Sequence, residues 1–85
     1  MLNGPIQECV RLIISNIEAL LQKSSMNIDN IVRVEIFLKN MDDFDLVNEE
    51  YALFFKGPVF PARQTIQAMR LPYDAPIEMS CIAAG

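Results

Sequence analysis

Apolar residues recur at every third or fourth position in the first part of the chain. Between Pro5 and about Lys23 the recurring positions are Ile6, Val10, Ile13, Ile17, Leu20 and Leu21. This spacing places them on one face of an α-helix. Pro5 suits the first helical position, because its missing N–H costs nothing there. The pattern therefore predicts an amphipathic helix from Pro5 to about Lys23.

The segment Ile31–Leu38 reads IVRVEIFL and predicts a β-strand, because it is rich in β-branched residues and flanked by polar ones. Alternation gives one wholly apolar face, which we expect to lie against the helices: Val32, Val34, Ile36 and Leu38. The opposite face is mixed: Ile31, Arg33, Glu35 and Phe37. A mixed face is expected where a sheet is only partly covered or meets another subunit.

The residues from Asp42 to Phe55 predict a second helix, with Asp42 as its N-cap. Its apolar stripe consists of Phe44, Val47, Tyr51, Phe54 and Phe55. Asn48 falls on a mostly polar face, where we expect it to cap a loop rather than bind a ligand.

Two more strands are predicted, Ala62–Arg70 and Ile77–Ala83. The order α-β-α-β-β predicts an α+β fold in which a small mixed sheet carries two helices on one face. We expect one domain over residues 1–85. Three strands leave a long edge and a bare face, which a partner normally closes.

Composition and charge exclude several classes of protein. The 85 residues carry a net charge of -4, which argues against a nucleic-acid partner. The chain has no histidine, which excludes Ser-His-Asp and Cys-His nucleophile systems. The longest apolar runs are too short to span a bilayer, and no signal peptide is visible. Cys9 and Cys81 have no metal or redox spacing, so we expect buried thiols and a cytoplasmic location.

Arg63 and Glu78 are the candidate site residues. Arg63 begins a strand, on the face that also carries Thr65 and Gln67, and its planar fork can bind a carboxylate. Glu78 interrupts an apolar strand, where it can pair with a cation or serve as a general acid or base. The plainer alternatives are a solvated arginine at a strand end and an edge-strand charge that deters aggregation.

Taken together, the motifs resemble the YjgF/Rid family of reactive-intermediate (imine/enamine) deaminases, also known as L-PSP endoribonucleases. The resemblance covers nearly the whole chain and rests on Val47–Tyr51, Phe54–Phe55, Phe60–Arg63, Leu71–Pro72 and Ile77–Met79. It implies a chorismate-mutase-like fold, a homotrimer with clefts between subunits, and small 2-imino acids such as 2-iminobutanoate as substrates. Hydrolysis to the 2-keto acid and ammonia would need no metal or cofactor.

The resemblance also implies roles for three residues. Arg63 would clamp the substrate carboxylate, Thr65 would contribute to substrate binding, and Glu78 would position the attacking water or manage a proton. Members of the family begin with a glycine-rich segment of strands, whereas this chain begins almost at the first helix. An alternative is therefore a non-catalytic module that binds small carboxylates or assists assembly. Ribonuclease activity is disfavoured by the net negative charge and the lack of histidine.

Overall fold

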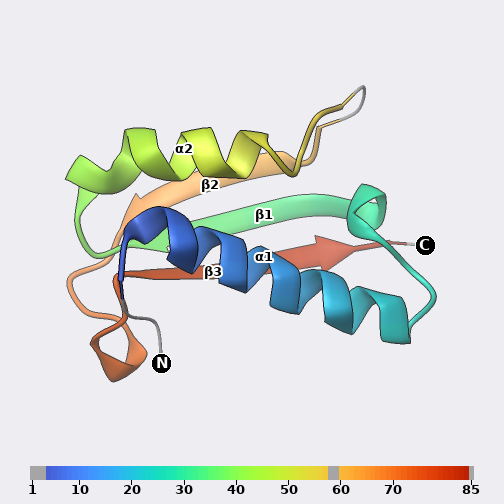
Figure 1. The fold of residues 1–85 in the computed structure, drawn as a ribbon, viewed down its shortest axis with the longest axis horizontal. Coiled ribbons are helices and arrows are strands. Elements are labelled where there is room, and N and C mark those ends of the chain that lie inside the picture. Colours follow the sequence, from blue (N-terminus) through green and yellow to red (C-terminus); the bar gives the residue numbers. More distant parts are fainter. Residues whose placement is uncertain (1–3, 58–59, 85) are drawn as a thin grey trace.

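The predicted succession of helices and strands is present in the folded chain (Figure 1). A computed structural model describes residues 4–57 and 60–84. Its helices and strands are α1 (Ile6–Lys23), β1 (Ile31–Leu38), α2 (Phe44–Ala52), β2 (Ala62–Gln67) and β3 (Ile77–Ala83). The bounds of β1 and β3 match the prediction, whereas β2 ends at Gln67 and not at Arg70.

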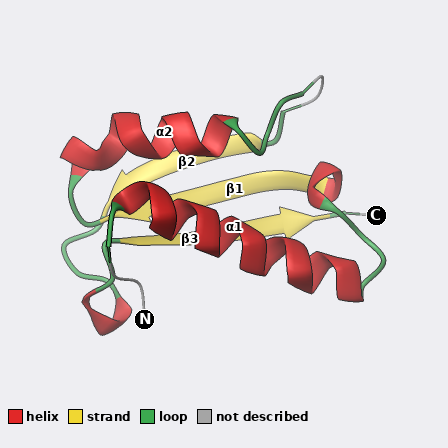
Figure 2. Ribbon diagram, viewed as in Figure 1, coloured by secondary structure: helices red, strands yellow, loops and turns green. Residues whose placement is uncertain are grey.

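Strand β1 lies at the centre of the sheet, whose order is β2-β1-β3. It pairs parallel with β2 and antiparallel with β3, so the sheet is mixed. Both helices cover the same face of the sheet, with α2 along β2 and α1 crossing the other two strands (Figure 2). The class and arrangement predicted from the sequence are confirmed.

The core lies between the helices and this face of the sheet. Its most deeply buried members are apolar: Cys9, Val10 and Ile14 from α1, Val34, Ile36 and Leu38 from β1, Val47 from α2, and Ile77 from β3. Helix α1 supplies one stripe and β1 supplies alternate residues, as the two periodicities require.

The predicted apolar face of β1 is wrong at its first residue. Val32 is 50% exposed, whereas Ile31 is buried. The pairing of β1 with β3 shifts register between Ile31 and Arg33, and such an irregularity reverses the side-chain alternation on one side of it. The alternation from Val34 onward follows the prediction.

The start of the second helix also differs from the prediction. Residues Met41–Asp43 form a 3-10 turn, and the side chain of Asn40 accepts a hydrogen bond from the Asp42 N–H at 2.9 Å. Asn40 therefore caps the 3-10 turn that leads into the helix, and Asp42, which was expected to be the N-cap, lies within that turn. The α-helix itself begins two residues after Asp42, at Phe44.

No described helix covers the second face of the sheet, which we call the bare face. The strand register places Glu35 and Phe37 of β1 there, with Ile66 of β2 beside them. Glu78 and Ile82 of β3 belong to the same face. Ile66 and Ile82 are 39% and 57% exposed. Arg33, the ladder partner of Ile82, is on this face too, so the bare face combines apolar side chains with charged groups of both signs.

Two adjacent leucines of α1 provide a matched test of the packing. Leu21 is buried in the core, whereas Leu20 is 64% exposed. We expect Leu21→Ala to lower the free energy of unfolding by about 2–4 kcal/mol, because it leaves a cavity. Leu20→Ala should change it by less than about 0.5 kcal/mol. Urea unfolding of both variants measures the difference, and equal losses would contradict the described orientation of α1.

Candidate functional site

Arg63 lies between β2 and α2, on the helix-covered side of the sheet. Its partner across the parallel ladder is the buried Val34, so its side chain leaves the strand toward the helices. There the Arg63 Nη1 donates a hydrogen bond to Asn48 Oδ1 at 2.5 Å. The Arg63 Cζ lies 4.9 Å from the centroid of the Tyr51 ring, within the range of a cation–π contact.

Tyr51 is buried, with 8% of its surface exposed, and its ring stacks on Phe55 at 4.3 Å between centroids. Its hydroxyl is buried and has no hydrogen-bond partner among the described residues. Burial raises the pKa of this phenol, and the positive charge of Arg63 partly opposes that rise. Tyr51 therefore stays neutral over the physiological pH range.

Thr65 shares its side of β2 with Arg63. Its ladder partner is the buried Ile36, and its own side chain is half-buried. The structure thus brings together the two residues to which the resemblance assigns substrate binding. The guanidinium group has five N–H donors, and one bond to Asn48 leaves the others without a partner among the described residues. These donors can bind a carboxylate.

Glu78 lies elsewhere. Its ladder partner is Phe37, which places it on the bare face, and it belongs to β3, the edge opposite β2. It borders a hollow of about 290 Å³ that is otherwise lined by Ile13, Pro72, Ala75, Ile77 and Met79. Within one copy of the chain, Glu78 and Arg63 therefore lie on opposite faces of the sheet and on different edge strands, with β1 between them.

Asn48 is the site residue that the sequence prediction missed. It was expected to cap a loop, and instead its oxygen holds Arg63. Tyr51 was correctly predicted to be buried, but its contact with Arg63 was not foreseen. The signal was the spacing of three residues between Asn48 and Tyr51, which places both on one side of α2.

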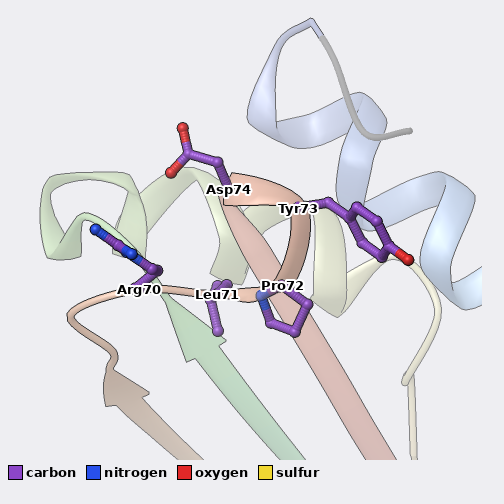
Figure 3. Close-up of a pocket in the computed structure, with 5 residues that line it drawn as sticks. All are labelled: Arg70, Leu71, Pro72, Tyr73 and Asp74. Atoms are coloured by element: carbon purple, nitrogen blue, oxygen red, sulfur yellow. The ribbon is translucent and has the colours of Figure 1, made fainter.

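A larger hollow, of about 680 Å³, lies along the segment from Arg70 to Asp74 (Figure 3). Arg70 and Tyr73 point away from each other in Figure 3, and Tyr73 is almost fully exposed. Ligand sites instead gather polar groups around an apolar cavity. We therefore assign the candidate site to Arg63 and its neighbours and not to this hollow.

Neither helix of the described chain has the length and apolarity that crossing a membrane requires. The same residues contain no group of three or more cysteine, aspartate or glutamate side chains placed to hold a metal ion. Cys9 is buried and Cys81 is half-buried, and burial raises the pKa of both thiols. For Cys9 the nearby Glu8 adds to that rise.

Comparison with known proteins identifies the family. The family model described as "Endoribonuclease L-PSP" matches residues 1–85. A protein of Dermatophagoides farinae named 2-iminobutanoate/2-iminopropanoate deaminase is 34% identical over 82 residues, which are 96% of this chain and 63% of that protein. The chain belongs to the L-PSP family, which is the YjgF/Rid family that its motifs resemble.

Two solved structures have the same fold. A Rid family protein of Yersinia pestis superposes with a TM-score of 0.94 at 35% identity, over 100% of this chain and 68% of that one. TdcF of E. coli, crystallised with bound serine, superposes with a TM-score of 0.93 at 28% identity, over 100% and 68%. The chain spans 65% of the length of a RutC family protein of Pyrococcus abyssi and 63% of the length of the Dermatophagoides farinae protein, slightly less than two thirds in each case.

The Tyr51 hydroxyl yields a prediction about stability. A buried hydroxyl without a partner carries a desolvation cost that no bond offsets. We expect Tyr51→Phe to leave the free energy of unfolding unchanged or to raise it by up to about 1 kcal/mol. Thermal and urea unfolding of the variant measure this change. A loss of more than about 1 kcal/mol would mean that the hydroxyl has a partner.

The ion pair beside the larger hollow yields a prediction about pH. Asp74 Oδ1 lies 2.5 Å from Lys39 Nζ, and this hydrogen bond with its charge holds the pKa of the Asp74 carboxyl below its usual range. The pair's contribution to stability is therefore present above the usual aspartate pKa and is lost as the pH falls through the lowered value. Lys39→Met should raise the Asp74 pKa toward its ordinary range. A carboxyl NMR titration that finds the same pKa in both proteins would contradict this assignment.

Proposed function

We propose that the chain is part of a hydrolase that deaminates reactive 2-imino acids, or their enamine tautomers, to 2-keto acids and ammonia. The observation that carries this proposal is Arg63, an exposed guanidinium that is held beside Asn48 and Tyr51 and keeps donors for a carboxylate. The name of the Dermatophagoides farinae relative, 2-iminobutanoate/2-iminopropanoate deaminase, supports the reaction class. The serine bound to TdcF supports a ligand with a carboxylate next to a nitrogen-bearing carbon.

The protein needs only to position the substrate and a water molecule, because an imine carbon is already electrophilic. Arg63 and Thr65 bind the substrate carboxylate and fix the position of that carbon. The Glu78 carboxylate accepts a proton as water adds to the carbon, and the imine nitrogen takes up a proton to give a carbinolamine. Collapse of the carbinolamine breaks the C–N bond, releases ammonia and leaves the 2-keto acid. The balance is one imine and one water consumed for one keto acid and one ammonia.

The proposed site needs more than one copy of the chain. Arg63 and Glu78 lie on opposite faces and opposite edges of one sheet, so a shared cleft must take them from different subunits. The exposed Ile66 and Ile82 of the bare face favour such an assembly, because apolar sheet faces are normally covered. We propose a homotrimer with clefts between subunits, and sedimentation analysis of the purified chain tests this.

Imine hydrolysis tests the reaction. A pyridoxal-phosphate threonine dehydratase generates 2-iminobutanoate, and semicarbazide traps whatever remains unhydrolysed. We expect the wild-type chain to lower trapping, and Arg63→Ala to reduce its rate of hydrolysis on the order of 100-fold. Arg11→Ala, an exposed arginine on α1, is the control and should be active. An active Arg63→Ala protein would exclude the proposed clamp.

Mixing two inactive variants tests whether the site is shared. When Arg63→Ala and Glu78→Gln chains are refolded together, some clefts receive an intact Arg63 from one chain and an intact Glu78 from another. Random assembly should restore about a quarter of the wild-type activity. No recovery would mean that both residues act within one subunit, and a Glu78→Gln chain that is active on its own would mean that Glu78 is not required. Binding of 2-oxobutanoate without turnover would instead favour a carboxylate-binding module.

A further inference from the structure

We propose that Asn48 and the Tyr51 ring are positioning residues, which fix the Arg63 guanidinium while leaving its positive charge uncompensated for a ligand carboxylate. This inference rests on the proposed function, in which Arg63 receives a carboxylate. It goes further by assigning roles to two residues of α2 and by explaining why the residue that touches Arg63 is an amide.

The Asn48 side chain contacts Arg63 through its amide oxygen. An amide oxygen accepts one N–H from Arg63 and carries no charge. An aspartate at the same position would form an ion pair with the guanidinium and compete with any incoming carboxylate. Helix α2 is rich in carboxylates, including Glu49 and Glu50, which follow Asn48 directly. The position that contacts Arg63 nevertheless carries a neutral acceptor.

The Tyr51 ring contacts the Arg63 guanidinium through its aromatic face. The Arg63 Cζ lies 4.9 Å from the ring centroid, and the ring is itself buried and stacked on Phe55. A fixed aromatic face attracts the guanidinium without supplying an anion. Together, the amide and the ring restrict a flexible side chain at two points, and neither neutralises it. The restriction lowers the entropy that Arg63 loses when it binds a ligand.

A merely structural role makes a different prediction. If the Arg63–Asn48 hydrogen bond served only to join β2 to α2, a stronger link would serve as well or better. Asn48→Asp forms that stronger link, whereas Asn48→Ala removes it. A purely structural role therefore predicts that Asn48→Asp binds the ligand at least as well as wild type, whereas the positioning role predicts that Asn48→Asp binds it more weakly.

The experiment compares affinity and stability in the full chain. The probe is 2-oxobutanoate, titrated into wild type, Asn48→Ala and Asn48→Asp, with Asn16→Asp on the exposed surface of α1 as the matched control. We expect Asn48→Ala to weaken binding several-fold and Asn48→Asp to weaken it on the order of tenfold or more, although Asn48→Asp unfolds at the higher urea concentration of the two. The control should bind as wild type does. An Asn48→Asp protein that binds as tightly as wild type would overturn the inference.

NMR of the side-chain nitrogens separates this inference from the proposed function. In the ligand-free wild type, the Arg63 Nη signals should show restricted rotation, which Asn48→Ala abolishes and Tyr51→Phe preserves. Free rotation in wild type would overturn the inference whatever the ligand does. Failure of the wild type to bind 2-oxobutanoate would contradict the proposed function, in which Arg63 binds a carboxylate. The Nη signals would still show whether Asn48 and Tyr51 hold Arg63.

Tyr51 is tested by variants that separate its ring from its hydroxyl. Tyr51→Phe keeps the aromatic face and should lose less affinity for 2-oxobutanoate than Tyr51→Leu does. Tyr51→Leu removes the face and should weaken binding several-fold. If Tyr51→Leu fails to fold, a loss of affinity of about tenfold or more in Tyr51→Phe would still contradict the role assigned to the ring, because that variant keeps the ring.

Discussion

The pairing register of β1 governs where every candidate site residue lies. Because side chains alternate along a strand, the partner of a buried β1 residue faces the helices, and the partner of its neighbour faces away. Val34 is buried, so Arg63 is directed toward α2, and Phe37 belongs to the other face, so Glu78 does too. A slip of one residue in either ladder would exchange the faces. The core of the protein and the geometry of its chemistry are therefore fixed by the same hydrogen bonds.

The two faces of the sheet differ in their electrostatic character. On the helix-covered face, the Arg63 guanidinium is the positive charge of the candidate site. The Asn48 amide and the Tyr51 ring hold it, and the whole chain has a net charge of -4. On the bare face, Glu35 and Glu78 lie among apolar side chains, and Arg33 is on the same face with its Nη2 donating a hydrogen bond to Gln64 Oε1. In the proposed trimer these two environments meet at a subunit boundary. There, a cation that fixes the substrate and a carboxylate that handles its proton can approach without first neutralising each other within one chain.

Local patterns in the sequence predicted most of the fold, and they failed where distant residues intervene. The bounds of β1 and β3 followed from β-branched runs, and α1 followed from its apolar spacing. Val32 was assigned to the wrong face because a register shift depends on pairing with β3, which no local pattern records. The candidate residues Arg63, Thr65 and Glu78 came from the sequence and its resemblance to a family. The role of Asn48 did not, because it depends on α2 lying beside β2.

The central position of β1 also shapes how the chain folds. Its antiparallel neighbour pairs residues as distant in the chain as Ile31 and Ala83, and its parallel neighbour is reached only through α2. Loops of this length close slowly, whereas helices form within about a microsecond. We therefore expect helical turns of α1 to form before the sheet that they cover is complete. Until β1 has paired with both neighbours, the chain exposes the same side chains that later make its interior, and in that state it is most prone to aggregate.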